Sequence, residues 1–115
     1  MSSVLITGAN RGIGLALVKE FLKQGDRVIA TARQPDKADE LNALSKTYHD
    51  PNYTVIPMDV TNADSVNQAY SKIAQSFSSL DILINNAGVN PDSKDEKFED
   101  MDIAHFEMAF DVNVV

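Results

Sequence analysis

Short apolar runs alternate along this chain with longer segments in which apolar residues recur every three or four positions. The runs are residues 3–6, 27–32, 53–57 and 80–84, and the periodic segments between them are residues 13–24, 36–47 and 61–77. Runs with so few charges are typical of parallel strands buried on both faces, and the period of the longer segments is helical. Three strand-helix units followed by a fourth strand predict an α/β fold with a parallel sheet and right-handed crossovers.

Several residues indicate where the helices begin and end. Gly25 stands where a left-handed C-cap would end the first helix, and Pro35 is placed to start the second. Thr61, with Asp64 three residues later, resembles a capping box and predicts the start of the third helix. Further on, residues 89–101 are polar and without period, which predicts a loop. Asp102 is then the expected N-cap of a last helix that continues to the end of the chain.

The link between the first strand and the first helix is rich in glycine, from Thr7 to Gly14 (Thr-Gly-Ala-Asn-Arg-Gly-Ile-Gly). Positions without Cβ allow a tight turn that brings the backbone close to a ligand. The first N–H groups of a helix have no partner in the helix, and its dipole adds positive charge, so such a turn can bind a pyrophosphate. The spacing differs from G-x-G-x-x-G, and a glycine-rich turn without a ligand is the alternative interpretation.

Composition and charge narrow the possible functions. The formal net charge of −7 argues against a nucleic-acid partner, because phosphate neutralisation needs clustered Lys and Arg. The chain has no cysteine, and neither His49 nor His105 stands in a metal-ligand spacing, so no metal site is predicted. We see no signal-peptide pattern and no apolar run of about 18 residues. We therefore expect a cytoplasmic protein without a membrane partner.

The strand ends carry the candidate cofactor chemistry. With strand order 3-2-1-4, the order reverses between the first and fourth strands, where ligands of open α/β sheets bind. The glycine turn, Arg33, Asp59 and the turn at residues 85–88 should therefore meet at one edge. Arg33 ends the second strand at a position where NAD-binding domains place an acid, and Arg11 is a second cation on the same side. Arginine there suits a ribose 2′-phosphate, which favours NADP(H).

Three motifs follow the strands: Thr7-Gly8-x-x-x-Gly12-Ile13-Gly14 after the first, Asp59-Val60 after the third and Asn85-Asn86-Ala87-Gly88 after the fourth. They resemble the motifs of the short-chain dehydrogenase/reductase family. Local details are most similar to the sniffer-like and C-factor-like carbonyl reductases. The resemblance implies a Rossmann-type doubly wound parallel sheet, an NADP(H) cofactor and hydride transfer between NADPH and a small-molecule carbonyl or alcohol substrate. The implied cofactor-binding residues are Thr7, Gly8, Asn10, Arg11, Gly12, Ile13, Gly14, Arg33, Asp59, Val60, Asn86, Ala87 and Gly88.

The resemblance also implies a catalytic part that this sequence lacks. Asn113, expected in the last helix, matches the catalytic asparagine of the family, but the serine and the Tyr-x-x-x-Lys pair have no match. We therefore interpret residues 1–115 as the NAD(P)-binding N-terminal part, with the sheet truncated before its later strands and residues 80–84 at its open edge. Alone, this part should be inactive, and the full-length form is expected to be a homo-oligomer.

Two other functions remain open at this point. One is a module that binds NADP(H) without catalysis, and the other is a truncated interaction protein that pairs its open sheet edge with another chain. The residues that follow position 115 would distinguish them from the enzyme, because a serine and a Tyr-x-x-x-Lys pair would supply the missing chemistry.

Overall fold

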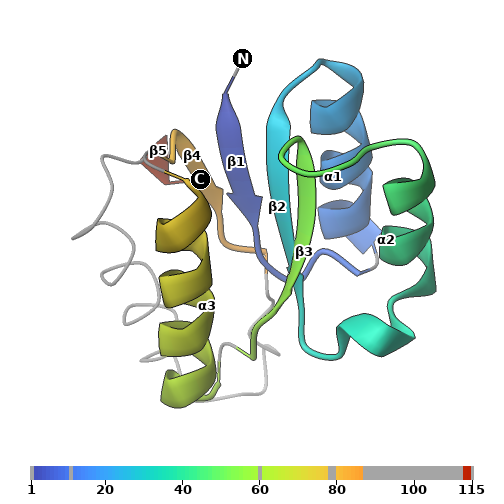
Figure 1. Cartoon of the computed structure of the whole chain (residues 1–115). Coiled ribbons are helices and arrows are strands. Elements are labelled where there is room, and N and C mark those ends of the chain that lie inside the picture. The colour runs from blue at the N-terminus through green and yellow to red at the C-terminus, as the bar shows by residue number, and fades with distance from the viewer. Residues whose placement is uncertain (1, 11, 60, 78–79, 87–112, 115) are drawn as a thin grey trace.

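A computed structural model describes residues 2–10, 12–59, 61–77 and 80–86, and the backbone of residues 113–114. Its strands form one parallel sheet in the order β3-β2-β1-β4-β5 (Figure 1). The strands are β1 (Ser3–Ile6), β2 (Arg27–Ala32), β3 (Tyr53–Pro57), β4 (Ile82–Ile84) and β5 (Asn113–Val114). The predicted doubly wound sheet with order 3-2-1-4 is confirmed. The first three strands have the predicted bounds, and β4 begins two residues later than expected.

Helices cover both faces of the sheet. They are α1 (Gly12–Lys23), the short helix α2 (Asp39–Ala43) between the 3₁₀ turns η1 (Pro35–Lys37) and η2 (Leu44–Lys46), and α3 (Ala63–Ser76). Figure 1 shows α1 and α2 on one face and α3 on the other. Because side chains alternate along a strand, Val4 and Ile6 pack into the core cluster that contains Val18 of α1, while Leu5 packs with Ile73 of α3. These five side chains are fully buried.

The end of α1 follows the prediction. Gly25 has a φ of 88°, and its N–H donates to the carbonyl of Leu22. The N–H of Asp26 donates to the carbonyl of Phe21, which completes a Schellman motif. The reversal returns the chain to the sheet at Arg27, where β2 begins.

The helix predicted over residues 36–47 was wrong as one continuous element. Ala38 has φ −91° and ψ 69°, which is not helical and separates η1 from α2. In a continuous helix the carbonyl of Pro35 would accept from the N–H of Asp39. It accepts instead from the N–H of Ala38 at 3.1 Å and from Nδ2 of Asn42 at 2.7 Å. The break leaves Ala38 and Leu41 buried in the core.

The start of α3 also differs from the prediction. Asn62, not Thr61, is the N-cap, and its side-chain oxygen accepts from the N–H of Ser65 at 3.1 Å. Thr61 instead donates from its hydroxyl and its N–H to Asp59. Both residue types can cap a helix, so local propensity did not distinguish them.

The predicted position of Asn113 in a helix was wrong. Asn113 and Val114 form β5 and pair with Ile82 and Leu83 of β4. Consequently, β4 is not the edge of the sheet, contrary to expectation. The loop predicted at residues 89–101 and the helix predicted from Asp102 lie outside the described residues.

Candidate functional site at the carboxyl ends of the strands

The glycine turn brings backbone very close to the first turn of α1. Gly8 and Gly12 have φ values of 59° and 60°, a region that favours glycine. Gly14 is required for a different reason, which is space. A Cβ added there would lie 2.6 Å from the carbonyl oxygen of Gly8 and 2.5 Å from Nδ2 of Asn86. The turn is therefore close-packed on its inner side, while Ile13 on its outer side is 72% exposed.

The asparagines that follow β4 connect that strand end to the glycine turn. Nδ2 of Asn86 donates to the carbonyl of Gly8 at 3.1 Å. The hydroxyl of Thr7 donates to Oδ1 of Asn85 at 3.0 Å, and its N–H donates to the carbonyl of Ile84 at the same distance. These contacts join residues that are 77 or 78 positions apart in the sequence. The structure therefore brings Asn85 and Asn86 to the glycine turn, as predicted.

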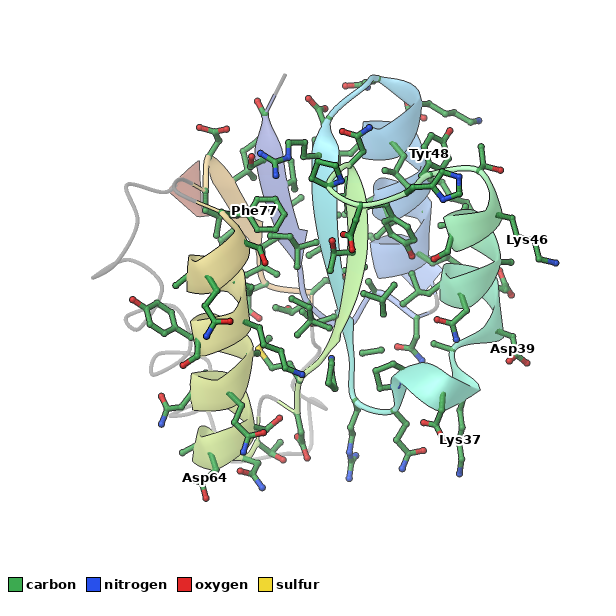
Figure 2. The ribbon with its side chains drawn as sticks, in the orientation of Figure 1. Lys37, Asp39, Lys46, Tyr48, Asp64 and Phe77 are labelled. Atoms are coloured by element: carbon green, nitrogen blue, oxygen red, sulfur yellow. The ribbon has the colours of Figure 1, made fainter. Side chains whose placement is uncertain are left out.

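A cavity of about 370 Å³ opens beside the end of β2. Its described lining consists of Asn10 from the glycine turn, Arg33 and Gln34 after β2, and Lys37 of η1. Figure 2 shows Lys37 near the carboxyl ends of the strands, whereas Tyr48 and Phe77 lie near their amino ends. The lining thus offers two cationic side chains and two amides. Among the described residues that line it, none is a carboxylate.

Lys37 was missed by the sequence prediction. It follows Arg33 by four residues and Pro35 by two, so a helical turn that begins at Pro35 carries it back toward the end of β2. That signal was present in the sequence. It was overlooked because residues 36–47 were interpreted as one continuous helix.

Asp59 lies next to Arg33 at this edge. Its Oδ2 is 3.5 Å from Nε of Arg33, whose side chain is 77% exposed, while that of Asp59 is 28% exposed. Its Oδ1 accepts from the hydroxyl of Thr61 at 2.6 Å and from the N–H of Thr61 at 3.0 Å. The Thr61 hydroxyl is the largest cause of the lowered pKa of the Asp59 carboxyl. Burial opposes it as the second-largest effect, and the Thr61 N–H and the Arg33 charge lower the pKa by smaller amounts. Asp59 is therefore a carboxylate at neutral pH.

Some predicted site residues cannot be placed. Arg11, Val60, Ala87 and Gly88 lie outside the described residues, and only the backbone of Asn113 is described. Their assignments stay predictions.

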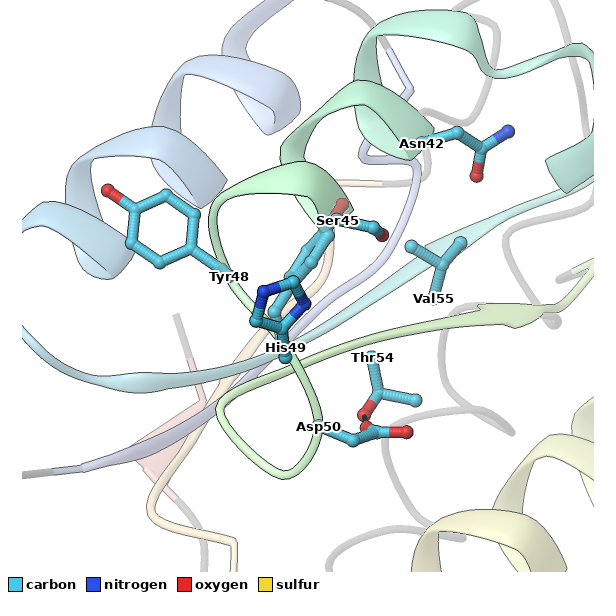
Figure 3. Close-up of a pocket in the computed structure, with 8 residues that line it drawn as sticks. Asn42, Ser45, Tyr48, His49, Asp50, Thr54 and Val55 are labelled. Atoms are coloured by element: carbon cyan, nitrogen blue, oxygen red, sulfur yellow. Dashed lines mark hydrogen bonds between the residues drawn. The ribbon is translucent and has the colours of Figure 1, made fainter.

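A second cavity, of about 330 Å³, lies at the other end of the sheet (Figure 3). Its lining is polar and includes Tyr48, His49, Asp50 and Thr54. Three of its polar side chains already form hydrogen bonds within the protein: Thr54 donates to Asp50, and the buried hydroxyl of Tyr53 donates to the carbonyl of Leu41 at 2.7 Å. This cavity has neither the paired cations nor the glycine turn of the first. It is the weaker candidate for a nucleotide site.

A comparison with protein-family models decides the relationship of the chain to known proteins. The model described as short chain dehydrogenase matches residues 2–115. The chain belongs to the short-chain dehydrogenase family. An uncharacterized oxidoreductase of Staphylococcus haemolyticus is 36% identical over 110 residues, which cover 96% of this chain and 45% of that protein.

Solved structures of family members have the same fold. The NADPH-bound carbonyl reductase from chicken fatty liver superposes with a TM-score of 0.76 at 31% identity, covering 96% of this chain and 47% of that one. A carbonyl reductase of Pseudomonas aeruginosa in complex with NADP gives a TM-score of 0.73 at 27% identity, covering 97% of this chain and 56% of that one. This short-chain dehydrogenase chain therefore spans about half the length of these three relatives.

The tyrosines of this family member lie away from the strand-end site. Tyr53 begins β3 at the amino end of the strand and is buried, which raises the pKa of its phenol. Tyr48 lines the second cavity, and Tyr70 packs against the core cluster beneath α3. In the described part of the chain, therefore, no tyrosine is placed to donate a proton at the carboxyl ends of the strands.

Within the described residues, no helix is long and apolar enough to cross a membrane. No group of three or more His, Cys, Asp or Glu side chains there could hold a metal ion.

Proposed function

We propose that this protein is an NADP(H)-dependent oxidoreductase that transfers hydride between NADPH and the carbonyl carbon of a small molecule, with this chain supplying the cofactor-binding half. The observation that carries the proposal is the 370 Å³ cavity lined by Arg33 and Lys37 beside the glycine turn. Two cations in one cavity of a chain with net charge −7 suit a bound phosphate. The NADP(H)-bound carbonyl reductases of similar fold also support the assignment.

The preference for NADP(H) over NAD(H) rests on what occupies the end of β2. A domain that binds NAD presents an acid there to the ribose 2′-hydroxyl. Here that position is Arg33, and the acids that precede and follow β2 in the sequence, Asp26 and Asp36, do not line the cavity. Asp26 lies at the amino end of β2, where its Oδ1 accepts from the N–H of Ser2 at 2.9 Å. Asp36 is exposed and is not part of the described lining. The donor set therefore fits a 2′-phosphate better than a 2′-hydroxyl.

The residues of this chain would bind and orient the cofactor. The first N–H groups of α1, at the tight turn that Gly14 permits, would hold the diphosphate, and Arg33 and Lys37 would hold the 2′-phosphate. The nicotinamide supplies the hydride when the cofactor is bound. The proton donor would come from a part of the full protein outside these 115 residues. A cytoplasmic location and a homo-oligomeric full-length form remain predictions.

The test is equilibrium titration of the protein with NADPH and NADH, followed by nicotinamide fluorescence. A charge-assisted hydrogen bond contributes about 1.5–3 kcal/mol, so Arg33→Gln or Lys37→Gln should weaken NADPH binding by about 10- to 150-fold and leave NADH binding nearly unchanged. Lys46→Gln is a matched control, because Lys46 is an exposed lysine in the other 3₁₀ turn beside α2. Equal affinities of the unmodified protein for NADPH and NADH would contradict the cofactor assignment.

A further inference from the structure

Asp59 is held by four hydrogen bonds to residues at the start of α3. Its N–H donates to the hydroxyl of Ser65 at 2.8 Å, and its carbonyl accepts from the N–H of Asn62 at 3.0 Å. Its Oδ1 accepts twice from Thr61, from the hydroxyl and from the N–H. Backbone and side chain are therefore both fixed. The other carboxylate oxygen, Oδ2, takes no part in these four hydrogen bonds and faces a different residue.

That residue is Arg33. Oδ2 of Asp59 lies 3.5 Å from Nε of the Arg33 guanidinium. Within the described residues, Arg33 has no ion-pair partner other than Asp59. Arg33 also lines the 370 Å³ cavity, together with Asn10 and Lys37. A guanidinium held at Nε keeps both Nη groups available for a phosphate, which it can bind through two parallel hydrogen bonds.

We propose that Thr61 is a positioning residue for the cofactor preference: through Asp59, it orients Arg33 so that the Nη groups face the 2′-phosphate of NADP(H). This inference rests on the proposed function and adds to it a residue outside the cavity. The hydroxyl of Thr61 restricts the rotation of the carboxylate, and the carboxylate restricts the rotation of the arginine. A freely rotating arginine side chain loses conformational entropy when it binds a phosphate. Restricting its rotation before the cofactor binds therefore reduces the entropic cost of binding.

The arrangement leaves Asp59 able to contact the cofactor as well. A carboxylate offers about four lone-pair positions, of which Thr61 uses two on Oδ1, while Oδ2 forms an ion pair with Arg33 at 3.5 Å. One acceptor position on Oδ2 remains, which is sufficient for the exocyclic amine of an adenine. The positioning of Arg33 is therefore compatible with the cofactor-binding role that the family resemblance implies for Asp59.

The expected effect is small and selective. An ion pair as exposed as that of Arg33 contributes little by itself, because solvent screens it. The variant Thr61→Val removes the hydroxyl but keeps the side-chain shape and the N–H. We expect it to lower the preference for NADPH over NADH, measured as the ratio of the two dissociation constants, by about three- to fivefold. Thr61→Ser keeps the hydroxyl and should retain the preference.

Two controls separate this role from a general structural one. Thr54→Val removes the same kind of contact, a threonine hydroxyl on an aspartate, at the other end of the sheet, and should leave the ratio unchanged. In an Arg33→Gln background, Thr61→Val should also leave the ratio unchanged, because the residue through which Thr61 acts is gone. The measurement is binding at equilibrium, without a carbonyl substrate.

The outcomes distinguish this inference from the proposed function. If the unmodified protein prefers NADPH but Thr61→Val keeps the full preference, or weakens NADPH and NADH equally, the positioning role is wrong and the proposed function stands. If the unmodified protein binds neither cofactor, or both equally well, the proposed cofactor assignment fails. A loss of preference that persists in the Arg33→Gln background would also overturn the inference.

Discussion

Gly14 is the position where a single added methyl group tests the geometry of the site most directly. In Gly14→Ala the new Cβ would lie 2.6 Å from the carbonyl oxygen of Gly8, 2.5 Å from Nδ2 of Asn86 and 3.1 Å from Cα of Ala9. The Asn86 side chain can rotate away, but it would then lose its hydrogen bond to Gly8. The two backbone atoms can move only if the whole turn moves. Substitution therefore disturbs the contact between the glycine turn and the end of β4.

The net effect is the sum of three contributions. Overpacking of a close-packed position costs about 1–3 kcal/mol, and the lost hydrogen bond of Asn86 costs about 1 kcal/mol more. Replacing glycine by alanine in a helix recovers about 1 kcal/mol through helix propensity. We therefore expect Gly14→Ala to lower the free energy of unfolding by about 1–3 kcal/mol.

Urea unfolding of the full chain, followed by circular dichroism, measures this difference. Ala16→Gly, at an exposed position of the same helix, calibrates the propensity contribution. The double variant Gly14→Ala/Asn86→Ala should remain less stable than Asn86→Ala alone, because the contact with the Gly8 carbonyl persists. If Gly14→Ala is as stable as the unmodified protein, the turn is not packed against α1 as described, and the reasoning is refuted.

Three further results are expected. Tyr53→Phe should lower stability by about 1 kcal/mol in urea unfolding, because it removes the buried bond to Leu41. Since burial raises the pKa of Tyr53, stability should be intact below about pH 10 and fall above it, and the Phe variant should lack this alkaline loss. The pKa of Asp59, measured by NMR titration, should lie below its usual value of about 3.9, and Thr61→Val should raise it. The stability linked to Asp59 should therefore be complete above about pH 4 and be lost as the pH falls through its lowered pKa. Finally, residues 1–115 with NADPH should reduce no aldehyde or ketone above background, and turnover by this chain would show that a proton donor was overlooked.

The sequence by itself determined the strands and the meeting of their ends. The runs at residues 3–6 and 27–32 match the observed strands, because burial on both faces leaves little choice of residue type. The run at residues 53–57 also matches, although β3 lies at the edge of the sheet and is only partly buried. The rule that strand ends converge where the strand order reverses then located the glycine turn, Arg33 and Asp59 at one edge. The strand positions follow from the local pattern of apolar residues, and the meeting of the strand ends follows from the handedness of the connections between the strands.

Only the tertiary structure decided features in which a residue had two comparable local options. The carbonyl of Pro35 could accept a helical N–H or the side chain of Asn42, and the buried, non-helical Ala38 accompanies the second choice. Thr61 could cap α3 or bind Asp59, and Asn62 was available as the cap. Asn113 pairs with β4 across about thirty residues of sequence, a contact that no local periodicity encodes. The Thr61–Asp59–Arg33 contacts are of the same kind, because they depend on which side chains packing brings within hydrogen-bond reach.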